Sequence, residues 1–524
     1  MTFHHHILAT SLLAISSIGF SAHAEEANTG SFSAHAEEAN TGCDINWGAE
    51  AIFSASSSSL APYYMASNRH GILTQGKNSL LRLSAFHEMD TARRFSYSFG
   101  ADIYTGYSNS TDYLRFDAAA DQWAANAQHP ARLWLQQLYG EVKYRGVFLS
   151  VGMKEHGSAL LNNRLSSGDL VESGNARPIP EVRVGFIDFQ NIPFTRGWVQ
   201  IQGEISYGKF MDKTWNQNHY NYYTNHINRG ALYSYKRCYF RTKPSERFSA
   251  TFGMQVGAMF GGTTDFYSRG ELVRTESFSR GVKQFFKMFI PTDGGVEYYT
   301  GSTLGSWDVL LRYRLRNGWE LKGYMQKPYE DGSGIGFLNG FDGLWGLELD
   351  INHRGPVKAA VIEYVDFDNQ SGPTHWDPDD VPGTTITSRA EGGDDYYNNH
   401  EYNSYQNYGM AIGTPFMVSP LYNLNGNLTF LYNRLRGFNA AVEGDISRAV
   451  SYRLMGSYRR SWGNGFIPLI QPKSATSVMG EIIWDVTKIK GLSVKGQIAF
   501  DRGELLGNNF GALLTLTYSG NFSL

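Results

Sequence analysis

Two polar segments of the chain, residues 215–225 and 394–405, combine aromatic rings with amide and carboxylate side chains. The flat face of a Tyr or Trp ring packs against the C–H face of a pyranose, and Asn and Asp side chains hydrogen-bond with its hydroxyls. Long loops of this composition are typical of recognition surfaces. We therefore predict two polysaccharide-binding loops; the alternative is that their tyrosines pack the loops down as a lid. The predicted binding residues are Trp215, Tyr220, Tyr222, Tyr223, Asp394, Asp395, Tyr396, Tyr397, Asn398, His400 and Tyr402.

A second segment has residue types that could support hydrolysis. His156 and Ser158, with Asn162 nearby, are similar to the His/Ser/Asn set of outer-membrane phospholipases. A His two residues from a Ser on one strand would share its face and could act as the base. Gly157 between them indicates a turn instead, so a hydrolase is the least favoured function and we predict that the protein is not an enzyme.

Metal-binding patterns are weak, and we predict no metal and no cofactor. Asp366, Asp368 and Gln370 resemble the start of an EF-hand loop, but the glutamate at its twelfth position is missing. The acidic run at Asp377, Asp379 and Asp380 fits a solvated loop better than a calcium site. The 14 histidines include no pair with zinc-ligand spacing.

The elements that would carry these loops are strands. Apolar and polar residues alternate in segments of about ten residues from Phe95 onward, as in 198–207, and a period of two places them on opposite faces of a sheet. Short turns such as Asn317-Gly318 alternate with long polar excursions at 211–229, 261–275 and 370–408. This pattern predicts an all-β fold, a transmembrane antiparallel barrel of about 18 strands with long extracellular loops. A secreted soluble all-β protein is the alternative. Residues 118–128 are predicted to form a short surface helix in a loop.

The N-terminus indicates export. The apolar run 7–20 is followed by Ala22-His23-Ala24, which predicts a signal peptide over 1–24, with cleavage after Ala36 as the alternative. An 11-residue unit at 20–30 recurs at 32–42, so 25–42 is interpreted as a duplicated linker. Residues 43–94 are interpreted as an N-terminal segment or reduced plug, and 95–524 as the barrel. Cys43 and Cys238 form a disulfide or remain two thiols.

Composition narrows the partners. The net charge of −3 and the charged fraction of 18% give no electrostatic reason for binding nucleic acid. After residue 20 no window approaches the roughly 18 consecutive apolar residues of a spanning helix. We expect a monomer in the outer membrane whose partners are membrane lipid and a surface polysaccharide.

Seven blocks are spread over residues 130–435: 137–144 (QLYGEVKY), 152–155 (GMKE), 165–168 (LSSG), 173–180 (SGNARPIP), 192–198 (IPFTRGW), 329–334 (YEDGSG) and 393–398 (GDDYYN). In order and spacing these blocks resemble the capsule assembly Wzi family of outer-membrane proteins. The resemblance implies an eighteen-stranded barrel that binds capsular polysaccharide without catalysis. An outer-membrane channel for sugars or other small solutes is the alternative function.

Within these blocks Asn175, Arg177, Pro178, Pro180, Glu330 and Asp331 are interpreted as a structural motif. The two prolines fix an extended approach to a strand, and Arg177 could pair with Glu155 or Glu204. One departure from the family is the short, Gly- and Pro-containing stretch 43–95, where the family has a helical bundle that closes the periplasmic end. A reduced or absent plug is therefore expected.

Overall fold

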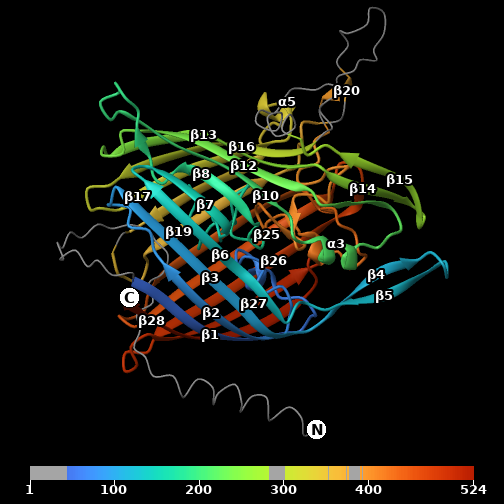
Figure 1. Ribbon diagram of the computed structural model, residues 1–524, viewed down its shortest axis with the longest axis horizontal. Coiled ribbons are helices and arrows are strands. Elements are labelled where there is room, and N and C mark those ends of the chain that lie inside the picture. Colours follow the sequence, from blue (N-terminus) through green and yellow to red (C-terminus); the bar gives the residue numbers. More distant parts are fainter. Residues whose placement is uncertain are drawn as a thin grey trace, which may run out of the picture.

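Antiparallel strands follow one another around a closed ring in the computed structural model (Figure 1). The structure describes residues 44–281, 301–351, 353–372, 375–376, 390–391 and 393–523. The signal peptide, the linker, Cys43 and the acidic run at 377–380 lie outside these ranges. Cys238 has a free thiol.

Within the described residues the wall has eighteen strands, because β9 (Gln190–Asn191) and β8 pair with successive parts of the same neighbour, β10. The predicted all-β barrel of about 18 strands is thereby confirmed. The wall strands are β1 (Asp44–Ser56), β2 (Asn78–His87), β3 (Phe95–Ser108), β6 (Leu133–Tyr144), β7 (Val147–Met153), β8 (Glu181–Phe186), β10 (Val199–Lys209), β12 (Leu232–Thr242), β13 (Phe248–Phe260), β16 (Gly301–Arg314), β17 (Glu320–Tyr329), β18 (Gly343–Asp350), β19 (Ala359–Asp366), β24 (Arg434–Asp445), β25 (Val450–Gly463), β26 (Pro468–Asp485), β27 (Leu492–Gly503) and β28 (Asn509–Ser523).

The first and last strands close the ring. β1 pairs with β28 from Asp44 opposite Ser523 to Ser56 opposite Gly511, and its other edge pairs with β2. The expected start of the barrel at residue 95 is therefore wrong, because β1 and β2 supply two wall strands within the stretch interpreted as a reduced plug. Without them β28 would leave an unpaired edge, which a bilayer cannot satisfy with hydrogen bonds.

The alternation in sequence becomes two faces of the wall. In β3, Phe95 and Tyr97 are 59% and 43% exposed on the outside, whereas Ser96, Ser98 and Asp102 are buried inside. Large exposed hydrophobic side chains recur in this way on strands all around the barrel. An apolar outer surface of this extent is the one that lipid covers in outer-membrane barrels. Among the described residues no helix is long and apolar enough to cross a membrane.

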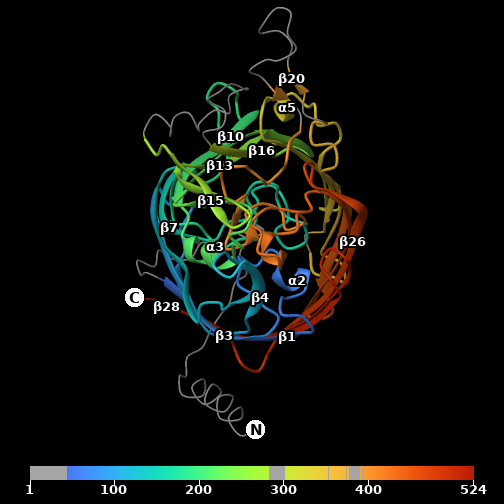
Figure 2. The ribbon, with the colours of Figure 1, turned by 90° about the vertical axis from the view of Figure 1, so that its right-hand side faces the viewer.

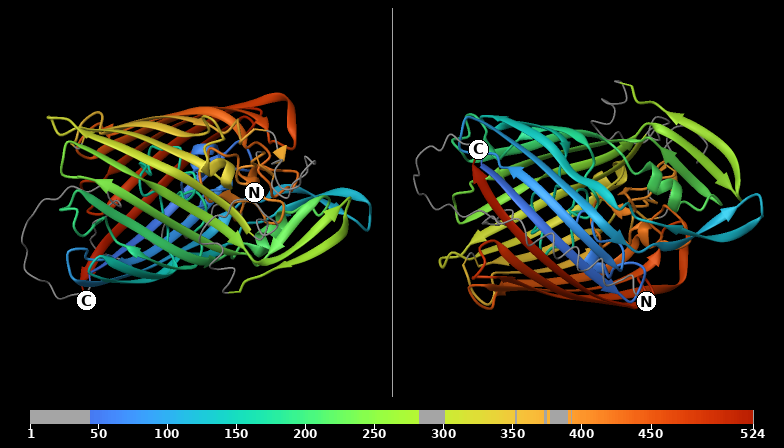
Figure 3. Two further views of the ribbon diagram at one scale, coloured as in Figure 1. Left: turned by 90° about the horizontal axis from the view of Figure 1, so that it is seen from above. Right: turned by 60° about the horizontal axis from the view of Figure 1, so that its bottom comes forward.

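The two ends of the barrel differ. Both termini of the sheet and the short connections, such as Arg145-Gly146 between β6 and β7, lie at one end, here called the turn end. The long connections lie at the other, here called the loop end (Figure 3). In barrels of this type the short turns face the periplasm and the long loops face the exterior.

The loop end carries two projecting hairpins. One is formed by β4 (Thr111–Asp117) and β5 (Gln122–Gln128), the other by β14 (Gly262–Ser268) and β15 (Glu271–Phe278), with β11 (Asn225–Arg229) beside β14 (Figure 3). The helix predicted over 118–128 is therefore wrong. Asp117 accepts hydrogen bonds from the amides of Ala119 and Ala120, which forms a turn, and Asp121 continues it with a positive φ of 48°.

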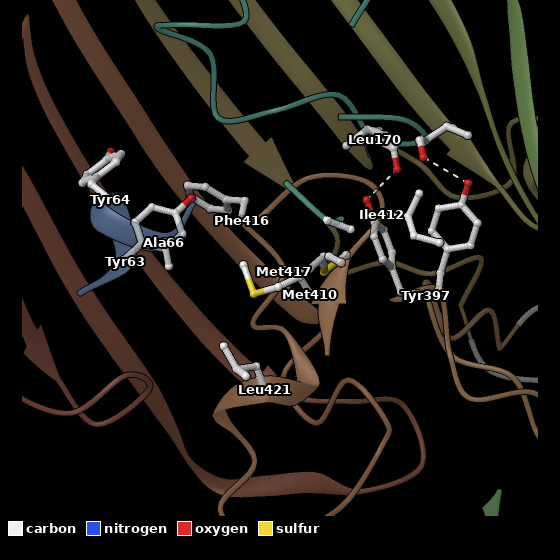
Figure 4. Close-up of a cluster of buried hydrophobic side chains, with 14 of the residues drawn as sticks. Tyr63, Tyr64, Ala66, Leu170, Tyr397, Met410, Ile412, Phe416, Met417 and Leu421 are labelled. Atoms are coloured by element: carbon white, nitrogen blue, oxygen red, sulfur yellow. Dashed lines mark hydrogen bonds between the residues drawn. The ribbon is translucent and has the colours of Figure 1, made fainter. Parts of the chain in front are cut away.

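Three segments from the loop end fold back into the barrel; we call 57–77, 154–180 and 393–433 the lumen segments. In Figure 2 the ring of strands surrounds α2 (Tyr63–Ala66) together with loop segments coloured teal and orange. Their apolar side chains form one buried cluster with residues of the wall, part of which Figure 4 shows. Leu165, Met65 and Phe416 in this cluster are completely buried. The remaining short elements are α3 (Lys213–His219), α5 (Gly332–Ile335), β20 (His375–Trp376), β21 (Ala390–Glu391), β22 (Gln406–Asn407), β23 (Met410–Ala411) and η2 (Pro420–Tyr422).

Candidate functional site

The tyrosines of the second predicted binding loop lie inside the protein. Tyr396 and Tyr402 are completely buried and Tyr397 is 3% exposed. The hydroxyl of Tyr396 donates to a carboxylate oxygen of Asp342 at 3.0 Å, and that of Tyr397 donates to the carbonyl of Leu170 at 2.5 Å (Figure 4). No ring face of these three is open to a sugar, so their predicted binding role is corrected to packing, which is the alternative stated for this loop.

The polar residues of the same loop fix its backbone. Asp394 accepts a hydrogen bond from Ser371, and Asp395 accepts one from Asn433 at 2.5 Å. The side-chain oxygen of Asn398 accepts from the amide of Phe430 at 2.7 Å. These interactions use the groups that were predicted to bind hydroxyls. His400 alone among the predicted residues of this loop is well exposed.

Glu330 holds the start of this loop against the end of β17. Its carboxylate accepts hydrogen bonds from the amides of Asp395 at 3.2 Å and Tyr397 at 3.1 Å. Burial, and then the nearby carboxylates of Asp394 and Asp395, raise the pKa of Glu330 well above its usual range. These contacts support the structural interpretation of Glu330. Asp331 follows it, and its carbonyl accepts the amide of Ile335 at 3.0 Å.

The Asn175–Pro180 motif also has structural contacts, with one change of partner. The side-chain amide of Asn175 donates to the carbonyl of Ala411 at 2.9 Å, joining two lumen segments. Arg177 lies between the rings of Trp134 and Tyr408, 4.9 Å and 4.8 Å from their centres. The expected pairing of Arg177 with Glu155 or Glu204 is therefore wrong. Pro178 leads to Pro180, whose carbonyl accepts the amide of Lys209 at 3.0 Å as β8 begins.

Glu204 has other partners. Arg183 donates to it at 2.6 Å and Arg237 lies 3.3 Å from its second oxygen. Glu204 therefore forms its charge-assisted contacts with two arginines of the barrel wall and not with Arg177.

The first predicted binding loop divides into a buried and an exposed part. Tyr220 is completely buried, and Trp215 stacks on His219 at 4.5 Å while its edge packs against Gly409. Tyr222 and Tyr223 remain partly exposed. Trp215 is also partly exposed, but its ring is stacked on His219, so Tyr222 and Tyr223 are the two that we retain as candidates.

Tyr222 and Tyr223 meet aromatic residues of both projecting hairpins. The Tyr223 ring centre lies 4.8 Å from that of Phe116 and 4.9 Å from that of Trp123, and Trp123 is 45% exposed. Tyr222 lies 5.4 Å from Tyr267 of β14. We call the set of Phe116, Trp123, Tyr222, Tyr223 and Tyr267 the aromatic patch.

Polar and charged groups border the aromatic patch. The guanidinium of Arg115 lies 4.7 Å from the centre of the Tyr222 ring, and Arg229 pairs with Asp265 at 2.5 Å close to Tyr267. Phe116, Trp123, Tyr267 and Arg115 were not among the predicted residues. The alternation of Tyr113, Arg115 and Asp117 with Leu114 and Phe116 could have indicated a strand. Because a helix was predicted over the following residues, 118–128, no hairpin was predicted there.

The hairpins are fixed to each other at the aromatic patch. The amide of Gly270, in the turn of β14–β15, donates to the carbonyl of Tyr223 at 2.8 Å, and Phe116 packs directly against Gly270. On the other side the amide of Phe116 donates to the carbonyl of Asn221 at 2.8 Å. The rings are thus held by backbone hydrogen bonds rather than carried on an unsupported loop.

The segment that resembles a hydrolase does not assemble a nucleophile. His156 pairs with Glu181 at 3.1 Å, while the Ser158 hydroxyl donates to Asp169 at 2.6 Å. A base must reach the hydroxyl it deprotonates, and here the two side chains contact different carboxylates.

The described residues contain no group of three or more potential metal ligands. Asp366 and Asp368, which resemble the start of a calcium loop, pair instead with Arg436 and Arg434, each at 3.0 Å.

One of the comparisons with known proteins, the one with solved structures, supports the fold. No family model matches the chain, and no curated protein matches it. Among solved structures, an Escherichia coli protein described as Wzi, an outer-membrane protein involved in group 1 capsule assembly and a carbohydrate-binding β-barrel, aligns with a TM-score of 0.53 at 13% identity. The alignment covers 90% of this chain and 83% of that one.

Two further similar structures are Acinetobacter baumannii OccAB2, with a TM-score of 0.45 and 9% identity, and Pseudomonas aeruginosa OpdL, with 0.44 and 10%. These alignments cover 91% of this chain in both cases, and 98% and 99% of those chains. At such low identity the first likeness establishes the outer-membrane type of barrel and nothing finer.

Proposed function

We propose that this protein is a Wzi-like outer-membrane lectin that binds a capsular or other surface polysaccharide at its loop end and performs no chemistry on it. The observation that carries the proposal is the aromatic patch, in which three rings of the two projecting hairpins meet Tyr222 and Tyr223 from the segment between α3 and β11. Partly exposed rings bordered by Arg115 and Asp265 are the combination that sugar recognition uses. The proposed binding residues are therefore Tyr222 and Tyr223 from the sequence prediction, joined by Phe116, Trp123 and Tyr267.

The position of the aromatic patch supports the same function. It lies on the end that faces the exterior in barrels of this type, where a polymer outside the cell is accessible. A barrel with one such patch needs no second copy to complete it, and we propose that it acts as a monomer surrounded by membrane lipid. An N-terminal signal peptide would deliver it there.

The contents of the lumen favour binding over transport of solutes. The lumen segments share one buried cluster with the wall, and Leu165, Met65 and Phe416 within it are completely buried. A diffusion channel needs a water-filled path, whereas packed side chains leave little room for one. The plug expected to be reduced is here supplied from the loop end by residues 57–77, 154–180 and 393–433.

Family membership is part of the proposal. It rests on the sequence blocks between residues 137 and 398 and on a barrel of the same type in the E. coli structure. The contacts of Glu330, Asn175 and Arg177 explain two of these blocks, 329–334 and 173–180, as supports of the lumen segments. A channel for sugars or small solutes is the competing function for the same barrel.

The test is retention of surface polysaccharide from the native cell on the purified, detergent-solubilised protein. Replacing Trp123 and Tyr223 by Ala should weaken binding by about tenfold or more, because each ring removed takes stacking surface with it; tenfold corresponds to about 1.4 kcal/mol. Phe466→Ala is the matched control, since Phe466 is 68% exposed in another loop at the same end. If the double variant retains as much polysaccharide as the wild-type protein, the aromatic patch is not the binding site. Steady open conductance of the wild-type protein in a planar bilayer would favour the channel instead.

A further inference from the structure

A cavity of about 220 Å³ lies inside the barrel, away from the aromatic patch. Its wall residues Arg453, Glu481 and Lys495 stand three or four positions from the strand ends that join the short turns, so the cavity is in the half of the lumen nearer the turn end. Arg69 and Arg164 of the lumen segments line it from the other side. The cavity therefore brings together side chains that are far apart in sequence.

The lining has an excess of positive charge. Four cations face one carboxylate: Arg69, Arg164, Arg453 and Lys495 surround Glu481. Arg453 lies 3.0 Å and Arg69 3.5 Å from the same Glu481 oxygen. Arg164 is bonded to Glu443 at 2.8 Å. Arg69 also donates a hydrogen bond to Gln497.

The remaining lumen carboxylates near the cavity are already engaged. Glu50 and Asp102 both pair with Arg82, at 3.4 Å and 2.8 Å. Within the part of the chain that the structure describes, Lys495 has no ion pair and no hydrogen bond from its ammonium group. The guanidinium of Arg453 donates to the carbonyl of Arg164 at 2.9 Å and to Glu481 at 3.0 Å, so it adds positive charge to the cavity while both of these donors stay bonded to the protein. Unpaired donors and clustered like charges are costly away from bulk water, and an anion in the cavity would relieve both.

We propose that this cavity binds an oxyanion, either the carboxylate of an acidic sugar or a phosphate group, held by the ammonium group of Lys495 and bordered by Arg69, Arg164 and Arg453. A cavity of about 220 Å³ suits one small charged group rather than a polymer. The lysine supplies a point charge with donors to spare, and the three guanidinium groups, which are bonded to Glu481, Gln497, Glu443 and a carbonyl, add positive charge around it. This site is separate from the aromatic patch and does not depend on the proposed polysaccharide binding.

The experiment is isothermal titration calorimetry of the full chain in a zwitterionic detergent at low ionic strength. Glucuronate, inorganic phosphate and uncharged glucose are titrated separately. At least one of the two anions should bind and glucose should not, and raising the sodium chloride concentration to about 1 M should weaken binding, because chloride competes for the same cations and the screening length falls to about 3 Å. Whichever anion binds identifies the group. Absence of binding by both anions overturns the proposal.

Variants assign the binding to the cavity. Lys495→Gln should weaken anion binding at least about tenfold, whereas Lys495→Arg should retain most of it because the charge stays. Lys322→Gln is the matched control, since Lys322 also faces the lumen near the turn end but is paired with Glu348 at 3.0 Å. Heat-dependent mobility in gels verifies that each variant forms a barrel. Equal weakening by the Lys322 and Lys495 variants, or none by either, contradicts the assignment.

Discussion

The guanidinium of Arg459 lies 3.7 Å from the centre of the Tyr63 ring, so the barrel wall holds the lumen helix α2 by a cation–π contact. The same side chain lies 4.7 Å from the ring of Phe416 and donates to its carbonyl at 3.1 Å. Arg459 is completely buried. One wall residue therefore joins two lumen segments that are more than 300 positions apart in sequence.

Replacing Arg459 by Ala should loosen the lumen segments, because a desolvated cation–π contact contributes about 2 kcal/mol and the carbonyl of Phe416 loses its donor. Limited trypsin digestion should then cut at Arg69, within the lumen segment 57–77 that contains Tyr63, faster than in the wild-type protein. Arg460→Ala is the control, since Arg460 is the next residue and faces outward. Equal protection in both variants would mean that other contacts hold these segments.

Tyr397→Phe should lower stability while leaving polysaccharide binding unchanged. Its hydroxyl donates to the carbonyl of Leu170 and accepts the amide of Thr414 at 3.0 Å, so removal leaves two buried groups unpaired, at a cost of about 1–3 kcal/mol. The midpoint of thermal unfolding should fall below that of Tyr458→Phe, whose ring is 45% exposed on the outer face. A loss of polymer binding without a loss of stability would restore Tyr397 to the binding site.

Stability at the loop end should depend on pH through Asp342. Burial raises the pKa of Asp342 to about 6, above the value of about 3.9 in an unfolded chain. The folded state therefore holds the proton over a range where the unfolded state has lost it, and this contribution to stability falls as pH rises from about 4 to about 6, then stays level. In Asp342→Asn the midpoint of thermal unfolding should no longer show this fall between a pH of about 4 and a pH of about 6. Asp112→Asn, at an exposed position, should show the same pH dependence of the thermal midpoint as the wild-type protein. The same pH dependence in the wild-type protein and both variants would contradict the role of Asp342.

Gly270→Ala should weaken polysaccharide binding although no aromatic residue is replaced. An added Cβ at Gly270 would lie 2.3 Å from the Phe116 ring, so Phe116 must move away from Tyr223. Gly507→Ala is a matched control, because Gly507 also has a positive φ, 75° against 85°, but an added Cβ there meets open space. Both variants have the same backbone strain, and the difference in polysaccharide affinity between them measures the displacement of the aromatic patch. Equal affinities would show that Phe116 does not position it.

The barrel itself was predictable because its cause is local. A period of two in polarity, as in Phe95, Tyr97 and Phe99 against Ser96 and Ser98, specifies a strand with one face for lipid and one for the interior. Repetition of such segments with alternating short and long connections specifies the class of barrel. The first two strands were missed because Pro62, Gly71 and Gly76, which lie in the connection between them, were taken to describe the whole stretch.

The candidate site was only partly predictable, because the composition of a loop does not specify whether a tyrosine in it is exposed to solvent or buried. Tyr222 and Tyr397 occur in similar polar surroundings in sequence, yet Tyr222 reaches the surface and Tyr397 lies 3% exposed within the barrel. The sequence by itself determined the barrel and the presence of aromatic-rich loops at one end. Tertiary structure alone decided which loops fold inward, since that depends on contacts such as Arg459–Tyr63 between residues hundreds of positions apart, whose spacing no local pattern records.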